Sequence, residues 1–179
     1  MNPSINQRLD SMIRAMTAIV IPAISEESSL AGEQARLVLG HLHLLRLQMD
    51  DAPRYDDMEW RAMKGLGTAL EQAAQGGEKT LRARDALSAA LRDCASDSSA
   101  SPALLRERVG TAVEALIDAS SADGDAASRK IIAKLVLRHG TVSAVRDRTW
   151  YSATQFEAEN NELPSMEEMF ADGDIDFAV

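Results

Sequence analysis

Two histidines have the residue type and spacing that first suggest chemistry, because histidine titrates near neutral pH and is a common metal ligand. His41 and His43 lie two residues apart in a segment with helical spacing. Two residues correspond to about 200° around a helix axis, so the two imidazoles point to nearly opposite sides and cannot bind one metal ion. We interpret each as a hydrogen-bonded core or interface residue, with an acid–base or ligand-binding role as the alternative.

That alternative needs a pocket between helices, where several polar side chains converge among apolar ones. The eight methionines of the chain could line such a pocket. The polar residues that would bind a small ligand or carry out catalysis there are His41, His43, Arg46 and His139.

Sequence motifs for known chemistry are absent. The chain contains no Glu-x-x-His, His-Glu-x-x-His or Gly-x-Ser-x-Gly, and no phosphate-binding glycine loop; Gly65 and Gly67 fall inside a helical pattern and are interpreted as allowing close helix approach. The spacing of Asp172, Asp174 and Asp176 resembles the start of a calcium loop, but Phe177 stands where that loop needs glycine. We therefore predict neither a metal site nor a cofactor.

The number of cysteines indicates the cellular compartment in which the protein is expected. Cys94 is the single cysteine, which excludes an internal disulfide and any multi-cysteine zinc site. We interpret it as a small buried residue, and we expect a cytoplasmic protein.

Charge is distributed unevenly along the chain. The formal net charge is -9, yet every Lys and Arg lies at or before Arg148 and eight acids follow it, so residues 1–148 are almost neutral. Binding to a phosphate backbone needs clustered Lys and Arg, which the sequence does not supply. We expect no nucleic-acid partner. We also expect no membrane span, because charges interrupt every apolar run.

Composition and periodicity predict helices. Aromatic residues make up 4% of the 179 residues, and Ala and Leu dominate the apolar set, which favours helix over strand. Caps and breakers divide the chain into about six helical segments. These run from Ser4 to about Ile24, from Leu30 to Met49, over 56–75, over 78–95, from Pro102 to about 122, and from about 126 to about Thr149. We predict an up-and-down antiparallel bundle of four to six helices.

The last residues form a separate segment in this prediction. Residues 1–150 make the helical bundle domain, and residues 151–179 make an acidic C-terminal tail. Ser165 and Glu168 match a capping box, which indicates a short helix near 165–171. That helix and the residues after it carry the apolar side chains of Met166, Met169, Phe170 and Phe177. Either the tail docks into a basic-rimmed groove, on this or another chain, or it is solvated.

The second segment is apolar over most of its circumference. Leu39 and Leu47 lie outside its main stripe, and a helix of this kind must be central or at an interface. We therefore expect a non-enzymatic protein–protein interaction or regulatory module that forms a homo-oligomer or binds another protein. The alternative is the small-ligand-binding or catalytic bundle described above.

Overall fold

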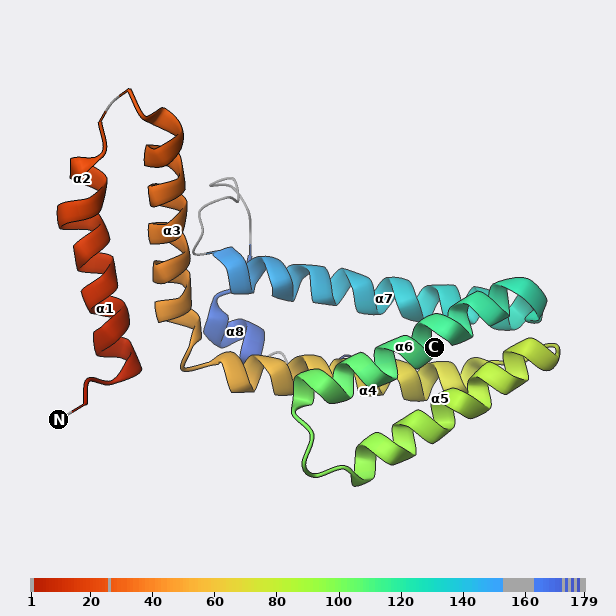
Figure 1. Ribbon diagram of the computed structural model, residues 1–179. Helices are drawn as coiled ribbons and strands as arrows, with labels where there is room; N and C mark the ends of the chain where they lie inside the picture. The colour runs from red at the N-terminus through yellow and green to blue at the C-terminus, as the bar shows by residue number, and fades with distance from the viewer. Residues whose placement is uncertain are drawn as a thin grey trace. The chain divides into compact units, whose positions relative to one another are not determined.

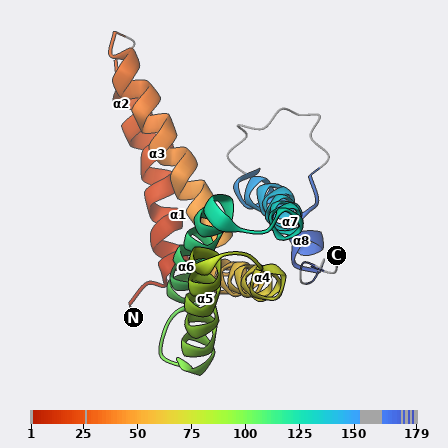
Figure 2. The same ribbon diagram turned by 90° about the vertical axis from the view of Figure 1, so that its right-hand side faces the viewer.

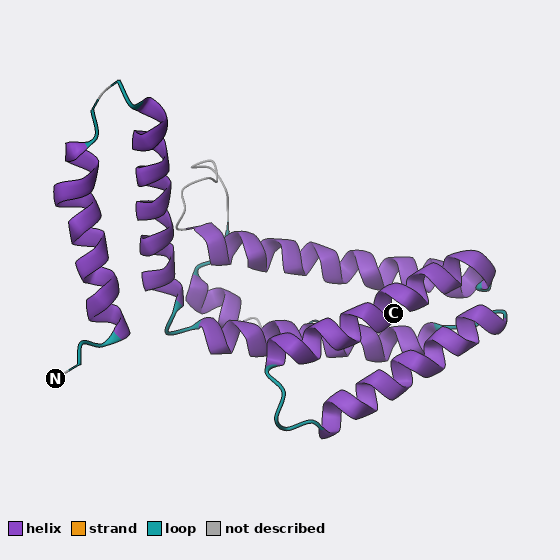
Figure 3. Ribbon diagram, viewed as in Figure 1, coloured by secondary structure: helices purple, strands orange, loops and turns teal. Residues whose placement is uncertain are grey.

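The computed structural model describes residues 2–25, 27–152 and 163–171, together with Gly173, Ile175 and Phe177. The prediction of an all-α fold is confirmed: the described residues form helices that pack against one another, and no strand occurs among them (Figures 1 and 3). None of the described helices is long and apolar enough to cross a membrane.

The chain divides into two compact units. Unit 1 contains residues Met1–Ala52 and Arg148–Leu163, and unit 2 contains Pro53–Asp147 and Pro164–Val179. The domain boundary expected at residue 150 stays a prediction.

Unit 1 is built on a helical hairpin. Its first arm consists of α1 (Ile5–Ala15), the π-helical turn η1 (Met16–Val20) and α2 (Ile21–Ala23), and its second arm is α3 (Ser29–Gln48). Ser4 begins α1 with a capping box, in which the Gln7 amide donates to Ser4 Oγ and the Ser4 amide donates to Gln7 Oε1. The two arms run antiparallel (Figure 1).

The π turn has an identifiable cause. Pro22 lacks an N–H, and its ring would clash with the carbonyl four residues earlier in a regular α-helix. Directly before it, the Ile21 amide donates to the Met16 carbonyl, five residues back. The wider turn keeps Ile21 and Ile24 half-buried, like Ile13 one turn before η1.

Unit 2 contains the longer helices. They are α4 (Ala52–Ala73), α5 (Glu78–Ser96), α6 (Pro102–Asp123), α7 (Ala126–Tyr151) and α8 (Met166–Ala171), with the first residue of α4 and the last four of α7 assigned to unit 1. The helices α4 to α7 alternate in direction, and α8 lies between α4 and α7 in both views (Figures 1 and 2). The buried core of this unit comprises Leu66, Leu70, Ala74, Leu87, Cys94, Leu105, Val109, Val113, Leu116, Ile132 and Leu135.

Close helix approach in this core depends on Gly67, as expected from its position in a helical pattern. A Cβ atom there would lie 3.1 Å from Val109 Cγ1 and 3.3 Å from Leu91 Cδ2, so α5 and α6 approach the backbone of α4 directly.

Two turns close one end of unit 2. The Gly77 amide donates to the Asp123 carbonyl (2.8 Å), and the Asp125 amide donates to the Gln75 carbonyl (3.0 Å), which joins the α4–α5 turn to the α6–α7 turn. Asp123 also accepts hydrogen bonds from the Lys79 and Thr80 amides at the start of α5. The Thr80 hydroxyl donates to the same carboxylate, and these bonds lower the pKa of Asp123.

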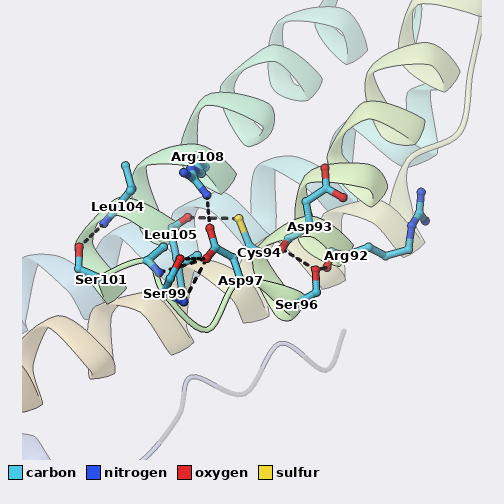
Figure 4. A network of polar contacts seen from close by, with 11 residues as sticks. Arg92, Asp93, Cys94, Ser96, Asp97, Ser99, Ser101, Leu104, Leu105 and Arg108 are labelled. Carbon is cyan, nitrogen blue, oxygen red and sulfur yellow. Dashed lines mark hydrogen bonds and ion pairs between the residues drawn. The ribbon is translucent and has the colours of Figure 1, made fainter.

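A second carboxylate organises the α5–α6 loop (Figure 4). Asp97 accepts hydrogen bonds from the Ser99 hydroxyl (2.7 Å), the Ser99 and Ala100 amides, and the Arg108 guanidinium (2.8 Å). The hydrogen bond from Ser99 and the one from Arg108 lower the pKa of Asp97 to about 2. The loop therefore leads directly into α6, which Ser101 caps through the Leu104 amide.

Candidate functional site

The hairpin of unit 1 has one apolar side and one largely polar side. On α1, Ile5 and Met12 are exposed and seven residues apart, and Ile19 in η1 continues the row. On α3, Val38 and Leu45 are likewise exposed and seven apart. Because the arms are antiparallel, helical geometry places both rows to the same side of the line along which the arms pack. We call these five residues the apolar side of the hairpin.

The hairpin buries little apolar surface by itself. Glu26 is not described. Among the other residues of the range 2–52, the buried apolar side chains are those of Leu9, Ala35 and Leu44. By contrast, Ile19 is 67% exposed, Leu45 is 53% exposed and Val38 is 49% exposed. An exposed apolar face of this extent is the usual mark of an interaction surface.

The two histidines of α3 lie on different sides of the hairpin. His41 is exposed on the apolar side, between Val38 and Leu45, whereas His43 is exposed on the opposite side near Arg36. Arg46 is paired with Asp10 of α1, with 3.1 Å between Nε and Oδ1. The structure thus does not gather His41, His43 and Arg46 into one pocket.

The two leucines expected at an interface differ in exposure. Leu39 is half-buried on the face of α3 that packs against α1, in line with Ala35 and Arg46. Leu47 is 62% exposed, but helical geometry places it on the side opposite Leu45.

Unit 2 contains a cluster of buried polar side chains that the sequence did not reveal. The Tyr55 hydroxyl donates to Asp147 Oδ1 at 2.5 Å, joining α4 to α7. One helical turn further along α4, Glu59 is 7% exposed, and its Oε2 lies 3.8 Å from the Arg106 guanidinium. Glu59 Oε1 is buried and has no hydrogen-bond partner within the described part of the chain.

Arg146 and His139 belong to the same cluster. Arg146 is 4% exposed; its Nη2 donates to the Gly173 carbonyl at 2.7 Å, while its Nη1 is buried without a partner among the described residues. The His139 ring is stacked on the Phe177 ring, with 6.4 Å between centroids, and its Nε2 is also buried and unpaired there. The predicted candidate His139 thus lies in a polar cluster of unit 2, whereas His41 and His43 belong to unit 1.

The electrostatics of the cluster follow from burial. Desolvation raises the pKa of Glu59, and Asp147 adds to this, while Arg146 and Arg106 oppose it. Burial raises the pKa of Tyr55, and so does its hydrogen bond to Asp147. Burial and the positive charge of Arg146 lower the pKa of His139. These shifts disfavour an ionised Glu59 and a protonated His139 in the folded protein.

The cluster could hold a polar group, but it lacks the arrangement of an acyl-transfer site. No hydroxyl or thiol among the described side chains is hydrogen-bonded to His139, so no activated nucleophile is formed there. Over the same part of the chain, no three His, Cys, Asp or Glu side chains are grouped so that they could hold a metal ion.

The four apolar residues singled out in the tail lie against unit 2 to different degrees. Met169 is buried, at 2% exposed, and Met166 is half-buried. The Phe170 ring packs under the Arg54 guanidinium, 4.2 Å from Cζ to the ring centroid. Phe177 contacts His139 and packs against the core of unit 2.

Sequence reasoning missed four residues of the cluster: Tyr55, Glu59, Arg146 and Asp147. A signal for two of them existed, because Tyr55 and Glu59 are four residues apart in line with the apolar positions Met58, Ala62 and Leu66 of the same helix face. Which helix supplies their partners depends on packing between segments about 90 residues apart.

Comparison of the chain with protein-family models, curated proteins and solved structures found no match.

Proposed function

We propose that this protein is a helical protein–protein interaction module that self-associates through the apolar side of its unit 1 hairpin. The observation that carries the proposal is the contrast between two buried and nine exposed large apolar residues in the hairpin. Two helices alone bury too little surface to be stable, because most helical stability in proteins comes from tertiary packing. Packing against further helices would supply the missing contacts.

A second copy of the hairpin fits this surface. The seven-residue spacing on both arms, Ile5 to Met12 to Ile19 and Val38 to Leu45, is the repeat with which helices interlock in coiled coils and four-helix bundles. The five residues that define the apolar side carry no charge. Two-fold pairing of identical surfaces is also the commonest form of oligomer.

The experiment replaces Val38 and Leu45 by Glu and measures the mass by native mass spectrometry. We expect wild-type protein at a multiple of 19.4 kDa and the variant at 19.4 kDa. Burying a Val or Leu contributes about 1.5–3 kcal/mol, so association should weaken by about 10³-fold or more.

Leu47→Glu is the matched control, because it places the same charge on an exposed leucine of the same helix but on the other side. It should leave the mass unchanged. A Val38→Glu/Leu45→Glu variant that keeps both its helix content and its oligomeric mass would rule out the proposal.

The composition supports two further parts of the proposal. A single cysteine fits a reducing compartment, so we infer a cytoplasmic protein. The near-neutral charge of residues 1–148 favours a protein partner over nucleic acid.

A small-ligand-binding function is the second candidate, and the buried cluster of unit 2 favours it. Unpaired polar atoms of Glu59, Arg146 and His139 lie in one cluster, and perturbed pKa values of this kind often occur at functional sites. A native mass spectrum of protein isolated from its own cells tests this candidate. A stoichiometric small-molecule adduct that is lost in Glu59→Gln would support it, and an adduct-free spectrum would count against it.

A further inference from the structure

The described residues of the C-terminal segment, 164–171, Gly173, Ile175 and Phe177, pack against unit 2. We call the surface of α4 and α7 that they contact the groove. Its helix α8 begins with a capping box, in which the Glu168 amide donates to Ser165 Oγ and the Ser165 amide donates to Glu168 Oε2. The helix lies between α4 and α7, and Met169 is its buried residue (Figures 1 and 2). Three further contacts hold the segment.

These three contacts come from α4 and α7. Arg54 covers the Phe170 ring, and Arg146 donates to the Gly173 carbonyl at 2.7 Å. Phe177 lies directly over Gly65, where a Cβ atom would be 2.9 Å from the ring. The absence of a side chain at Gly65 therefore provides the space that the Phe177 ring fills.

Charge complements this apolar fit. The described part of the segment contains Glu167 and Glu168, while the groove residues include the cations Arg54 and Arg146. Beside Phe177 the surface is hollowed along α4, with a volume of about 570 Å³. That hollow is lined by Arg61, Lys64, Gly65, Thr68, Ala69, Gln72 and Phe177, and so adds two more cations. An acidic segment with spaced Met and Phe anchors is thus what the groove recognises.

We propose that this groove of unit 2 also binds the segment Leu163–Phe177 of a second copy, so that two copies exchange their C-terminal segments. The groove residues named above belong to α4 and α7, so an identical segment from another chain would make the same contacts. A second copy is the occupant whose fit the structure itself demonstrates. Exchange of an identical element between protomers is a low-cost route to a dimer.

The inference rests on the proposed self-association but uses a different surface. In the wild-type chain the attached segment competes at high effective concentration, which hides binding of a segment from another chain. The test therefore needs two full-length chains with complementary defects. One chain carries Gly65→Leu, which fills the space that the Phe177 ring occupies and leaves the segment intact. The other chain carries Met169→Asp and Phe177→Asp, which remove two apolar contacts of the segment and leave the groove intact.

Both chains also carry Val38→Glu and Leu45→Glu, which remove the proposed hairpin contact. Each chain alone is expected at the monomer mass, and the mixture is expected to shift to the sum of the two masses in native mass spectrometry. A chain that combines Gly65→Leu with both segment substitutions is the matched control, and it should form no heterodimer with the chain that carries Met169→Asp and Phe177→Asp.

A mixture that stays at the two monomer masses, while both chains keep wild-type helix content in circular dichroism, would overturn the exchange proposal. If Gly65→Leu fails to fold, Gly65→Ala fills the same space with a smaller group and gives the same two outcomes. Failure here leaves the hairpin proposal standing, because that proposal is decided by Val38→Glu/Leu45→Glu in the otherwise wild-type chain.

Discussion

Glu59 and Arg146 are each more than nine-tenths buried, and each keeps one polar atom without a hydrogen-bond partner in the described part of the chain. A buried charge of this kind costs stability unless it is fully paired. The two opposite charges attract each other, but burial outweighs that attraction for Glu59, since its pKa is raised. The unpaired buried atoms of these two side chains therefore lower the stability of the folded protein, as is common at binding sites.

The raised pKa of Glu59 gives a pH prediction at the residue scale. The folded state holds the Glu59 proton more tightly than the unfolded state, so this residue stabilises the fold below its unfolded pKa of about 4.3. That contribution is lost as pH rises through the folded pKa. We expect Glu59→Gln to remove this decline in urea unfolding followed from pH 4 to pH 8.

Glu71→Gln is the control, because Glu71 lies on the same helix but is only partly buried. It should follow the wild-type curve. Parallel curves for Glu59→Gln and the wild type would show that the folded protein does not hold the Glu59 proton more tightly.

At the scale of elements, the joined turns of unit 2 contain a backbone conformation that only glycine adopts readily. Gly76 has φ of 152°, and a Cβ atom there would lie 2.5 Å from Gly124 Cα. The contact between the α4–α5 turn and the α6–α7 turn therefore depends on the absence of a side chain at Gly76.

Gly76→Ala should therefore destabilise unit 2 by more than about 1 kcal/mol, because alanine at positive φ is strained and its methyl group would displace the second turn. Thermal unfolding by circular dichroism measures the effect. Gly140→Ala is the contrasting variant, since Gly140 lies in α7 with no neighbour within 4 Å of an added Cβ. It should stabilise by about 0.5–1 kcal/mol. A Gly76→Ala variant as stable as Gly140→Ala would contradict the role of this contact.

Local signals allowed most helices to be predicted, and the exceptions have physical causes. Ser4 caps its helix as expected, because a cap depends on residues within one turn. The third segment was expected to begin at residue 56, but α4 begins at Ala52 and has Pro53 in its first turn. Proline fits the first turn of a helix, where its missing N–H would have no partner in any case, and the sequence does not distinguish this use from a proline that ends a helix.

The candidate site was less predictable than the helices. His139 and Phe177 were both named from the sequence, but their stacking joins residues from α7 and the tail. The pairing of Arg46 with Asp10 likewise depends on how two helices pack. Pattern and spacing locate faces on single helices, whereas a site depends on which faces meet.

At the scale of the whole molecule, the two units differ in how their apolar residues are covered. Unit 2 has a continuous buried core that includes Cys94, whereas the hairpin of unit 1 leaves half of its large apolar residues exposed. The folding of unit 2 should therefore be independent of assembly. The folding of the hairpin should depend on protein concentration.

The rate at which a thiol reagent labels Cys94 measures how well the core of unit 2 is covered. Cys94 is 4% exposed, and burial raises the pKa of its thiol, so a thiol reagent should reach it only when α5 and α6 separate. We expect labelling to be about 10³-fold or more slower than at a cysteine introduced by Ser98→Cys in the exposed loop, at every protein concentration. Rapid labelling, or protection that falls on dilution, would show that the core of unit 2 is not closed by itself.

The π turn of the hairpin has a consequence for changes in chain length. It uses five residues where an α-helix uses four, and so sets the direction of every side chain after it. Loss of any one codon between Met16 and Val20 would leave composition and helical propensity almost unchanged. The four residues left would close a regular α-helical turn, so Ile21 and Ile24 would keep their present side of the helix. Pro22 would then face the carbonyl four residues before it, so a deletion here should cost stability through the proline ring and not through a change of helix face.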